Sequence, residues 1–499
     1  MCEKKRLHPV AIVANLLKEI KEAIFPIIIT FIISAGEQEG ALDLFVFFVP
    51  FIIIAFTIIS GFVRWLRFTY RIEEGELRIE HGLFVRKKRY IPFERIQSIS
   101  TSEGILQRLF GLVKMTIETA GGAGETEAML SAISKEESAR IQSMFEMAKA
   151  KVLQENSMES VDEEQSFAEG TRPIIEEKKE LVYMMSFKEI LFVSLTSGGA
   201  LGIIAAAVAF LSQFDELIPF DKLYSEFLNF VAHGIVLASI VGMFIIFVAY
   251  LVAIIRSMLK YSNFTVERTD ENVIISYGLL EIRRTTVPLN RVQGVEIREH
   301  FIRSLFGYAS VYVVNAGSGS TEESHDNILL FPFIKKETIA EIMKKILPEY
   351  AIDVPIHPVP ERAKFRYIVR PFYYITIPIA IGIYFLRPWG WLLLLLFPIF
   401  SIIGYISYRF AGWNITENQL VLRHRFINGK TMYMFKNRIQ ALEIQSNWFQ
   451  RRKKLGTIQS SIKSSIGSAE GKTVDVDEEV LMDIYKWYSR SQPNEGEWI

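Results

Sequence analysis

Apolar residues in this 499-residue chain gather into three pairs of blocks, and a long polar segment follows each pair. A membrane-spanning helix needs about 20 mostly apolar residues. Five blocks reach or approach that length, whereas the first is shorter and has to borrow from the amphipathic stretch before it. Buried helices of a soluble protein are the alternative, but three successive pairs favour membrane hairpins. The blocks lie at residues 23–36, 44–63, 189–211, 228–255, 367–386 and 389–408.

The polar segments carry the period of β-strands instead. Apolar and polar positions alternate on either side of a short turn in residues 76–92, 272–288 and 419–435. Such alternation is typical of antiparallel hairpins with one buried face. A helix-period pattern closes each segment, at residues 135–153, 335–347 and 477–489. The pattern therefore predicts one unit built three times: two membrane helices, then a small β-domain that ends in a helix.

One phrase recurs in the polar segments, as PFERIQSI at 92–99, PLNRVQGV at 288–295 and FKNRIQAL at 435–442. The glycine that closes the next short turn follows the arginine of the phrase by 16, 16 and 18 residues. Spacing this regular predicts a repeated domain, in which each arginine holds a turn before a strand; a ligand-binding role is the alternative. The residues of this repeat signature are Arg95, Gln97, Gly111, Arg291, Gln293, Gly307, Arg438, Gln440 and Gly456.

The phrase IPFERIQSI, the turn LQRLFG and a strand ending in TAGG resemble the bacterial pleckstrin-homology-like (PH-like) domain. Residues 409–489 match more loosely, because Met434 and Phe435 replace the Ile-Pro pair. The whole arrangement resembles the YdbT-like membrane proteins of Gram-positive bacteria. This resemblance implies a polytopic α-helical membrane protein, with about six transmembrane helices in three hairpins. It also implies three cytoplasmic PH-like domains, each a β-sandwich or barrel with a C-terminal helix.

Domain boundaries follow from the same pattern. Residues 154–180 are acidic and poor in large apolar residues, so the segment 154–186 is expected to be a flexible linker. The segment 348–366 is proline-rich and expected to be extended. The predicted order is hairpin 1 with its N-terminal segment (1–63), PH-like domain 1 (64–153), the acidic linker (154–186), hairpin 2 (187–256), PH-like domain 2 (257–347), the proline-rich linker (348–366), hairpin 3 (367–408), PH-like domain 3 (409–490) and a tail (491–499).

Charge sets the expected orientation. Cations follow the second, fourth and sixth apolar blocks, whereas the links inside each pair carry few cations. Positive residues stay on the cytoplasmic side of a membrane. The N-terminus and the three polar segments are therefore expected on the cytoplasmic side of a bacterial cell membrane. Formal net charge is zero, with 56 Lys plus Arg against 56 Asp plus Glu. That balance gives no reason to expect a nucleic-acid partner.

Candidate chemistry is sparse. The loops AGGAGETE and AGSGSTEE carry glutamates beside their glycines, which would repel phosphate, and they lack the lysine of a phosphate-binding loop. No histidine pair has helical metal-ligand spacing, and Cys2 is a single cysteine. No cofactor, small-molecule substrate or enzymatic activity is therefore expected. The apolar blocks hold almost no ionisable residues, which favours anchors over a transport pathway, although a transporter or lipid-translocating protein is the alternative function.

Two basic clusters are candidates for contact with an anionic lipid surface, at roughly 1 kcal/mol for each cation near it. They consist of Arg86, Lys87, Lys88, Arg89, Arg451, Arg452, Lys453 and Lys454. The expected function is a non-enzymatic membrane scaffold that binds a protein partner or anionic lipid in the bilayer. The family resemblance implies either another PH-like-domain membrane protein or self-association as the partner, and cell-envelope stress or antimicrobial-peptide resistance as the setting.

Overall fold

The computed structural model of the chain describes residues 4–13, 16, 41–73, 75–83, 85–119, 128–158, 179–196, 235–315, 327–385, 389–464 and 467–489. Within these ranges, three helical segments are long and apolar enough to cross a membrane: Met243–Tyr261, Glu361–Phe385 and Gly390–Phe410. The block at 44–63 lies in a 27-residue helix, α2 (Ala41–Arg67). The block at 23–36 and most of 189–211 lie outside the described residues, so the structure does not test the predicted count of six.

Each polar segment forms six short strands that end in a helix. The first β-domain contains β1 (Thr69–Glu73), β2 (Glu76–His81), β3 (Lys87–Pro92), η1 (Phe93–Arg95), β4 (Ile96–Glu103), α3 (Ile105–Leu109), β5 (Leu112–Thr119), β6 (Ala128–Ser134) and α4 (Lys135–Met158). The second contains β8 (Thr265–Arg268), β9 (Asn272–Tyr277), β10 (Ile282–Pro288), η3 (Leu289–Arg291), β11 (Val292–Glu299), α9 (Phe301–Leu305), β12 (Tyr308–Asn315), β13 (Asn327–Lys335) and α10 (Lys336–Ile346). The third contains β15 (Gly412–Ile415), β16 (Gln419–Arg425), β17 (Gly429–Phe435), η6 (Lys436–Arg438), β18 (Ile439–Gln445), α14 (Trp448–Arg451), β19 (Leu455–Ser464), β20 (Gly467–Asp477) and α15 (Glu478–Tyr488).

Burial follows the alternation in the sequence. Leu77 and Ile79 of β2, Met115 and Ile117 of β5 and Ile141 of α4 all belong to one buried cluster of the first domain. Similar clusters fill the second and third domains. Side chains two positions apart share one face of a strand, so β2 turns the row of Leu77 and Ile79 toward this core, whereas β11 is buried along nearly its whole length. Each domain is built around one of these clusters, and Val421 and Tyr433 of the third domain also contribute to the cluster of the second.

The sheets do not stop at the domain boundaries. The second sheet of the first domain and the first sheet of the second domain form one seven-stranded sheet, in the order β6-β5-β4-β10-β9-β8-β7. The next pair of domains is joined in the same way, in the order β13-β12-β11-β17-β16-β15-β14. The two three-stranded sheets, β1-β2-β3 and β18-β19-β20, stand at the two ends of the stack. We call the β4–β10 pairing joint 1 and the β11–β17 pairing joint 2.

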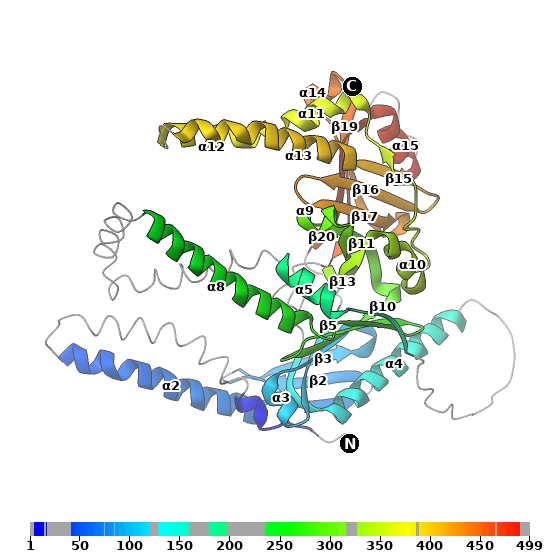
Figure 1. Cartoon of the computed structure of the whole chain (residues 1–499). Coiled ribbons are helices and arrows are strands. Elements are labelled where there is room, and N and C mark those ends of the chain that lie inside the picture. Colours follow the sequence, from blue (N-terminus) through cyan, green and yellow to red (C-terminus); the bar gives the residue numbers. More distant parts are fainter. Residues whose placement is uncertain are drawn as a thin grey trace.

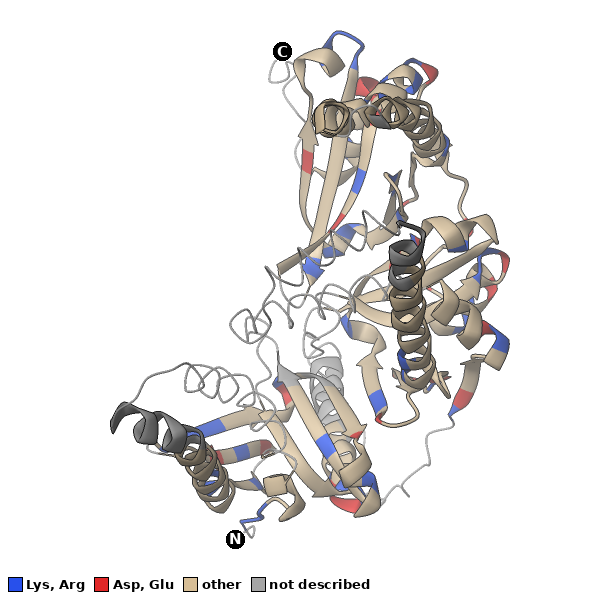
Figure 2. Cartoon of the chain, turned by 60° about the vertical axis from the view of Figure 1, so that its left-hand side comes forward, with Lys and Arg blue, Asp and Glu red and all other residues tan. Residues whose placement is uncertain are grey.

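The long apolar helices leave the stack of β-domains on one side (Figure 1). They are α2, α8 (Ile235–Tyr261), and the pair α12 (Phe372–Phe385) and α13 (Leu396–Phe410), which are linked through η5 (Trp389–Leu395). The domain-closing helices α10 and α15 lie on the other side (Figure 1). Lys and Arg are absent from these apolar helices except near the ends next to the sheets (Figure 2). A short helix, α5 (Phe187–Leu195), begins the third apolar block.

Both linkers contain regular structure. Helix α4 continues to Met158, into the segment expected to be a linker. At the other end of that segment, β7 (Glu180–Met184) adds to the edge of β8. In the proline-rich linker, β14 (His357–Pro358) pairs with β15, and η4 (Glu361–Ala363) leads into α11 (Lys364–Val369). These strands form because the neighbouring sheet edges offer unpaired backbone donors and acceptors, which composition alone does not show.

The closing turn of the third domain differs from the sequence expectation. Gly111 and Gly307 end their turns with positive φ angles, of 66° and 77°. In the third domain the positive φ belongs to Lys454, at 50°, and not to Gly456. Lys454 lies 16 residues after Arg438, the spacing of the other two domains. Gly456 instead lies in β19 against Leu481. The spacing from the signature arginine to the left-handed turn residue is therefore the same in all three domains.

Candidate functional site

Three short helices expose large apolar side chains. Helix α3 and the residue after it expose Leu109 by 75 % and Phe110 by 59 %. Helix α9 occupies the equivalent place in the second domain and α14 in the third, and both expose side chains of the same kind. The set comprises Ile105, Leu109, Phe110, Ile302, Leu305, Phe306, Trp448 and Phe449. A helix of one or two turns has too little surface to bury all these groups against a small domain.

In every domain the loop between the second and third strands, here called the hairpin loop, rests on the end of the preceding apolar helix. Arg67 of α2 donates to the Leu83 carbonyl in the first domain. In the second, the Leu279 amide donates to the Leu259 carbonyl of α8 at 3.0 Å. In the third, the Ser407 hydroxyl of α13 donates to the Phe426 carbonyl at 3.1 Å. The loops also expose apolar side chains: Val85, Leu279, Leu280, Phe426 and Ile427.

Loops and short helices of successive domains touch. Arg108 of α3 donates to the Leu279 carbonyl of the next domain at 3.4 Å. The Phe301 amide of α9 donates to the Asn428 side chain of the domain after that, at 3.1 Å. These contacts connect α3, α9 and the hairpin loops where the apolar helices meet the β-domains, and α14 lies beside α11 because Gln450 and Arg366 both donate to Asp475. We call the surface made of α3, α9, α14 and the three hairpin loops the helix-proximal face.

A groove of about 470 Å³ opens on this face beside the last turns of α8. Its walls are mainly apolar, and cations from α8 and β10 stand among them. The lining residues are Val252, Ile255, Arg256, Leu259, Lys260, Tyr277, Leu280, Glu281 and Arg283. An apolar wall with cations at the end of a membrane helix suits the boundary between the acyl chains and headgroups of anionic lipids.

The two predicted basic clusters lie in different settings. Arg451 to Lys454 are exposed at the end of α14, and the Arg452 guanidinium lies 3.8 Å from the centre of the Trp448 ring. Arg86 pairs with Glu80 next to the first hairpin loop. Lys87, Lys88 and Arg89 are exposed on β3, at the end of the stack. The third-domain cluster therefore belongs to the helix-proximal face, whereas most of the first-domain cluster lies on a sheet edge.

Buried charges fasten the domains to their helices. Arg303 of α9 donates to the Val193 carbonyl at 3.3 Å and to the Thr196 hydroxyl at 2.9 Å, at the end of α5. Burial lowers the pKa of the Arg303 guanidinium. In the third domain, the fully buried Asp475 accepts from Arg366 at 3.0 Å and also pairs with Arg370, next to α12. Such contacts fix the angle between the apolar helices and the β-domains.

Comparison with known proteins agrees with this architecture. The family described as the bacterial PH domain matches three times, at residues 24–147, 203–350 and 365–492. The chain belongs to the bacterial PH domain family. It is also 39 % identical over 502 residues to the UPF0699 transmembrane protein YdbT of Bacillus subtilis (strain 168), covering 98 % of this chain and 99 % of that protein. No solved structure matches. The resemblance read from the repeated phrase is confirmed, and the chain is a membrane protein with repeated PH domains.

The signature arginines lie at the opposite end of β3, β10 and β17 from the hairpin loops, whereas Gly111 and Gly307 close the turns after α3 and α9. Each arginine is the last residue of a 3-10 turn before the second sheet. Arg438 donates to the Asn290 carbonyl of the second domain at 3.2 Å, and the Gln293 side chain donates to the Arg291 carbonyl at 3.1 Å. Arg95 and Gln440 are exposed, and the side chain of Gln97 lies outside the described residues. The turn position is shared, but the partners differ from domain to domain.

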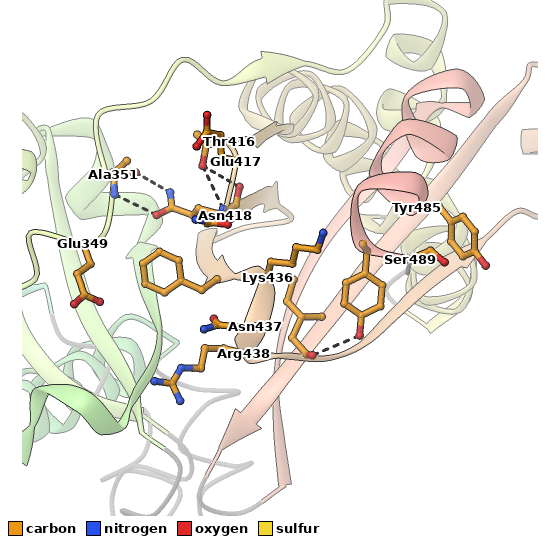
Figure 3. Close-up of a pocket in the computed structure, with 14 residues that line it drawn as sticks. Glu349, Ala351, Thr416, Glu417, Asn418, Lys436, Asn437, Arg438, Tyr485 and Ser489 are labelled. Atoms are coloured by element: carbon orange, nitrogen blue, oxygen red, sulfur yellow. Dashed lines mark hydrogen bonds between the residues drawn. The ribbon is translucent and has the colours of Figure 1, made fainter. Parts of the chain in front are cut away.

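A cavity of about 1310 Å³ lies beside the signature turn of the third PH domain (Figure 3). Lys436, Asn437 and Arg438 line one part of it, and Tyr485 and Ser489 of the C-terminal segment line another. Glu349, which follows α10 of the second domain, contributes an acidic side chain to the lining. Among the described residues, no three His, Cys, Asp or Glu side chains are placed to hold a metal ion.

The repeated signature does not point to the apolar residues of the helix-proximal face. The spacing from the signature arginine to the glycine identifies the phrases ILQRLFG, FIRSLFG and WFQRRKKLG only as short turns closed by glycine. A usable signal was present, because each phrase contains two or more large apolar residues at positions that a single helical turn cannot bury together. Whether such residues face a core or the outside depends on the domain that carries the helix, so only the three-dimensional arrangement places them.

Proposed function

We propose that this protein is a non-enzymatic, multi-pass scaffold of a bacterial cell membrane, whose PH domains lie on the cytoplasmic side and press the helix-proximal face onto anionic lipid. The observation that carries the proposal is the repeated exposure of large apolar side chains where the apolar helices meet the β-domains. Exposed apolar patches mark interaction surfaces. Here the nearest apolar medium is the bilayer that the helices enter.

The composition of the face fits the lipid boundary. Trp448 and Phe449 are 58 % and 63 % exposed, and four cations follow in α14 and its turn. Aromatic side chains are enriched at membrane interfaces, and each cation near an anionic surface contributes about 1 kcal/mol. The pairing of aromatic and basic residues on one short helix therefore favours contact with lipid headgroups over exposure to bulk water.

The described spans favour an anchor over a transport pathway. Residues 243–255, 372–385 and 390–408, in α8, α12 and η5–α13, contain no Asp, Glu, Lys or Arg. Carriers that move ions or polar substrates place such groups inside the membrane despite their cost. The PH domain is a non-catalytic domain type, and its sheets here continue from one domain into the next. Holding surfaces at a fixed height above the bilayer is a function that this arrangement can perform.

Fluorescence quenching tests the lipid contact. The full chain is placed in nanodiscs that contain lipids with a quencher near the headgroup, and the contribution of Trp448 is taken as the difference from Trp448→Phe. We expect strong quenching of Trp448, greater with anionic than with zwitterionic lipid and weaker at high salt. The matched control is Trp487 of α15, which donates to the Glu417 carbonyl on the far side of the domain.

Two results would count against the proposal. One is equal quenching of Trp448 and Trp487, because only the first lies on the helix-proximal face. The other is equal quenching of Trp448 in anionic and zwitterionic lipid, because the four cations beside it would then have no role in binding. Removal of the cations by Arg451→Gln and Arg452→Gln should reduce the difference between the two lipid types.

A further inference from the structure

The two joints between PH domains use one register. In joint 1, Glu103 of β4 lies opposite Ile282 of β10. Counted from the signature arginines, Glu103 is eight residues after Arg95, and Ile282 is nine residues before Arg291. The first domain therefore presents the strand that follows its signature turn, and the second domain presents the strand that precedes its own.

Joint 2 repeats this geometry. Glu299 of β11 lies opposite Gly429 of β17. Glu299 is again eight residues after its signature arginine, Arg291, and Gly429 is nine residues before Arg438. Two joints with different sequences share the same pairing, so the pairing is a property of the domain type and not of one pair of strands.

The same two kinds of edge remain unpaired at the ends of the stack. In the described residues, β3 has β2 as its only strand neighbour, and β18 has only β19. Lys87 to Tyr90 of β3 are exposed, and so are Gln440, Ala441 and Glu443 of β18. By contrast, β11 is buried along nearly its whole length in joint 2. An exposed, unpaired strand is a template for adding another strand.

Charges on the free edges match those of joint 2. There, Lys430 of β17 pairs with the fully buried Glu296 of β11 at 3.3 Å. Lys430 lies eight residues before its signature arginine, and Glu296 lies five residues after its own. On the free edges, Lys87 occupies the first position and Glu443 the second. The free edges thus carry the two residues that form the ion pair inside the chain.

We infer that a second copy of this chain adds to the stack head to tail, with β18 of one copy pairing antiparallel with β3 of the next. The shared register places Glu443 opposite Arg89, Ile444 opposite Lys88 and Leu442 opposite Tyr90. Glu443 then lies diagonally across from Lys87, as Glu296 does from Lys430.

Pairing of two β3 edges is a weaker alternative within a homo-oligomer. Two β3 edges would bring Lys87, Lys88 and Arg89 against their own copies, and like charges across strands are destabilising. The head-to-tail contact has a further consequence for the membrane. Both internal joints leave the apolar helices on one side of the stack, so a third joint of the same register keeps a second copy in the same bilayer (Figure 1). Such a contact is heterologous and builds rings or open filaments.

Cysteine crosslinking of the full chain in nanodiscs or native membranes tests this register. In a Cys2→Ser background, the variant Lys88→Cys with Ile444→Cys is expected to form a ladder of crosslinked oligomers under mild oxidation. The control, Lys88→Cys with Gln440→Cys, is four residues out of register and should form none. Each single cysteine variant should also form no crosslink, because head-to-tail pairing never brings two copies of one edge together.

Charge reversal gives an independent measurement. Lys87→Glu and Glu443→Lys are each expected to lower the association constant by about tenfold, and the double variant to restore it. Restoration also shows that the variants fold. Equal crosslinking in and out of register, crosslinking of a single variant, or no rescue by the double variant would overturn the inference. Lipid quenching of Trp448 reports on a different face, so either proposal can fail while the other holds.

Discussion

At the residue scale, the conformation of single positions decides how alike the three PH domains are. Gly111, Gly307 and Lys454 occupy the same left-handed turn position. The amide of each donates to the carbonyl three residues before it. Glycine adopts a positive φ without steric cost, whereas a lysine pays for its Cβ there. The third domain therefore holds a small strain that the other two lack.

Replacement of this lysine should stabilise the protein. Lys454→Gly is expected to raise the free energy of unfolding by about 1 kcal/mol, because the left-handed strain is removed. The measurement is chemical unfolding of the full chain in detergent, followed by tryptophan fluorescence. Lys453→Gly is the matched control, since it removes the same charge at a position without a positive φ. A gain in the control as large as in Lys454→Gly would contradict the argument.

At the scale of elements, strand edges join the domains, and charged residues are buried where they do so. Glu296 is fully buried in joint 2 beside Lys430 and Asn327. Glu299 lies near Arg425 at 3.2 Å in the same joint. Removing one partner of such a group leaves a buried charge without compensation. The buried charges therefore favour one register in joint 2. The stability of the joint also depends on whether titratable side chains near it are protonated.

Acid should loosen this joint through two histidines. Burial, together with Arg303 and Arg298, lowers the pKa of His300 to about 4. Burial, with Lys430 and Lys472, lowers the pKa of His424 to about 4. The unfolded chain binds these protons near pH 6.5, so the stabilisation is complete above that pH and is lost as pH falls toward 4.

The thermal unfolding midpoint of the full chain between pH 7.5 and 4.5 measures this effect. Between pH 7.5 and 4.5, the unfolding midpoint of the double variant His300→Gln and His424→Gln is expected to fall by fewer degrees than that of the parent. His357→Gln, at an exposed position in β14, serves as the control and should follow the parent. An unchanged pH profile in the double variant would show that other groups govern acid unfolding.

At the scale of the whole molecule, the β-domains form one stack with the apolar helices on a single side (Figure 1). This arrangement fits a protein whose spans enter one membrane and whose domains share one compartment. The cations near the ends of α2, α8 and α13 favour the cytoplasm as that compartment. The inside position of the domains is part of the proposed function.

Labelling of intact cells tests this orientation. In a Cys2→Ser background, a cysteine at Asp43, at the start of α2, should react with a membrane-impermeant maleimide from outside. A cysteine at Asp270, in an exposed turn of the second PH domain, should react only after the cells are opened. Labelling of Asp270→Cys in intact cells, with protection of Asp43→Cys, would reverse the topology.

The sequence by itself determined the repeat, the strand and helix types and the family, because each depends on local periodicity and on spacing within one domain. Alternation placed Leu77 and Ile79 in a core, and the phrase around Arg95, Arg291 and Arg438 located the three turns. Only the tertiary structure decided that Lys454 replaces a glycine, that the short helices expose their apolar groups, and that β4 joins β10 while β11 joins β17. The turn at Lys454 depends on how the third domain folds around it, and the exposure of the short helices depends on which surface the domain turns outward. The two joints form through backbone groups that every residue carries, so local periodicity does not determine which strand edges pair.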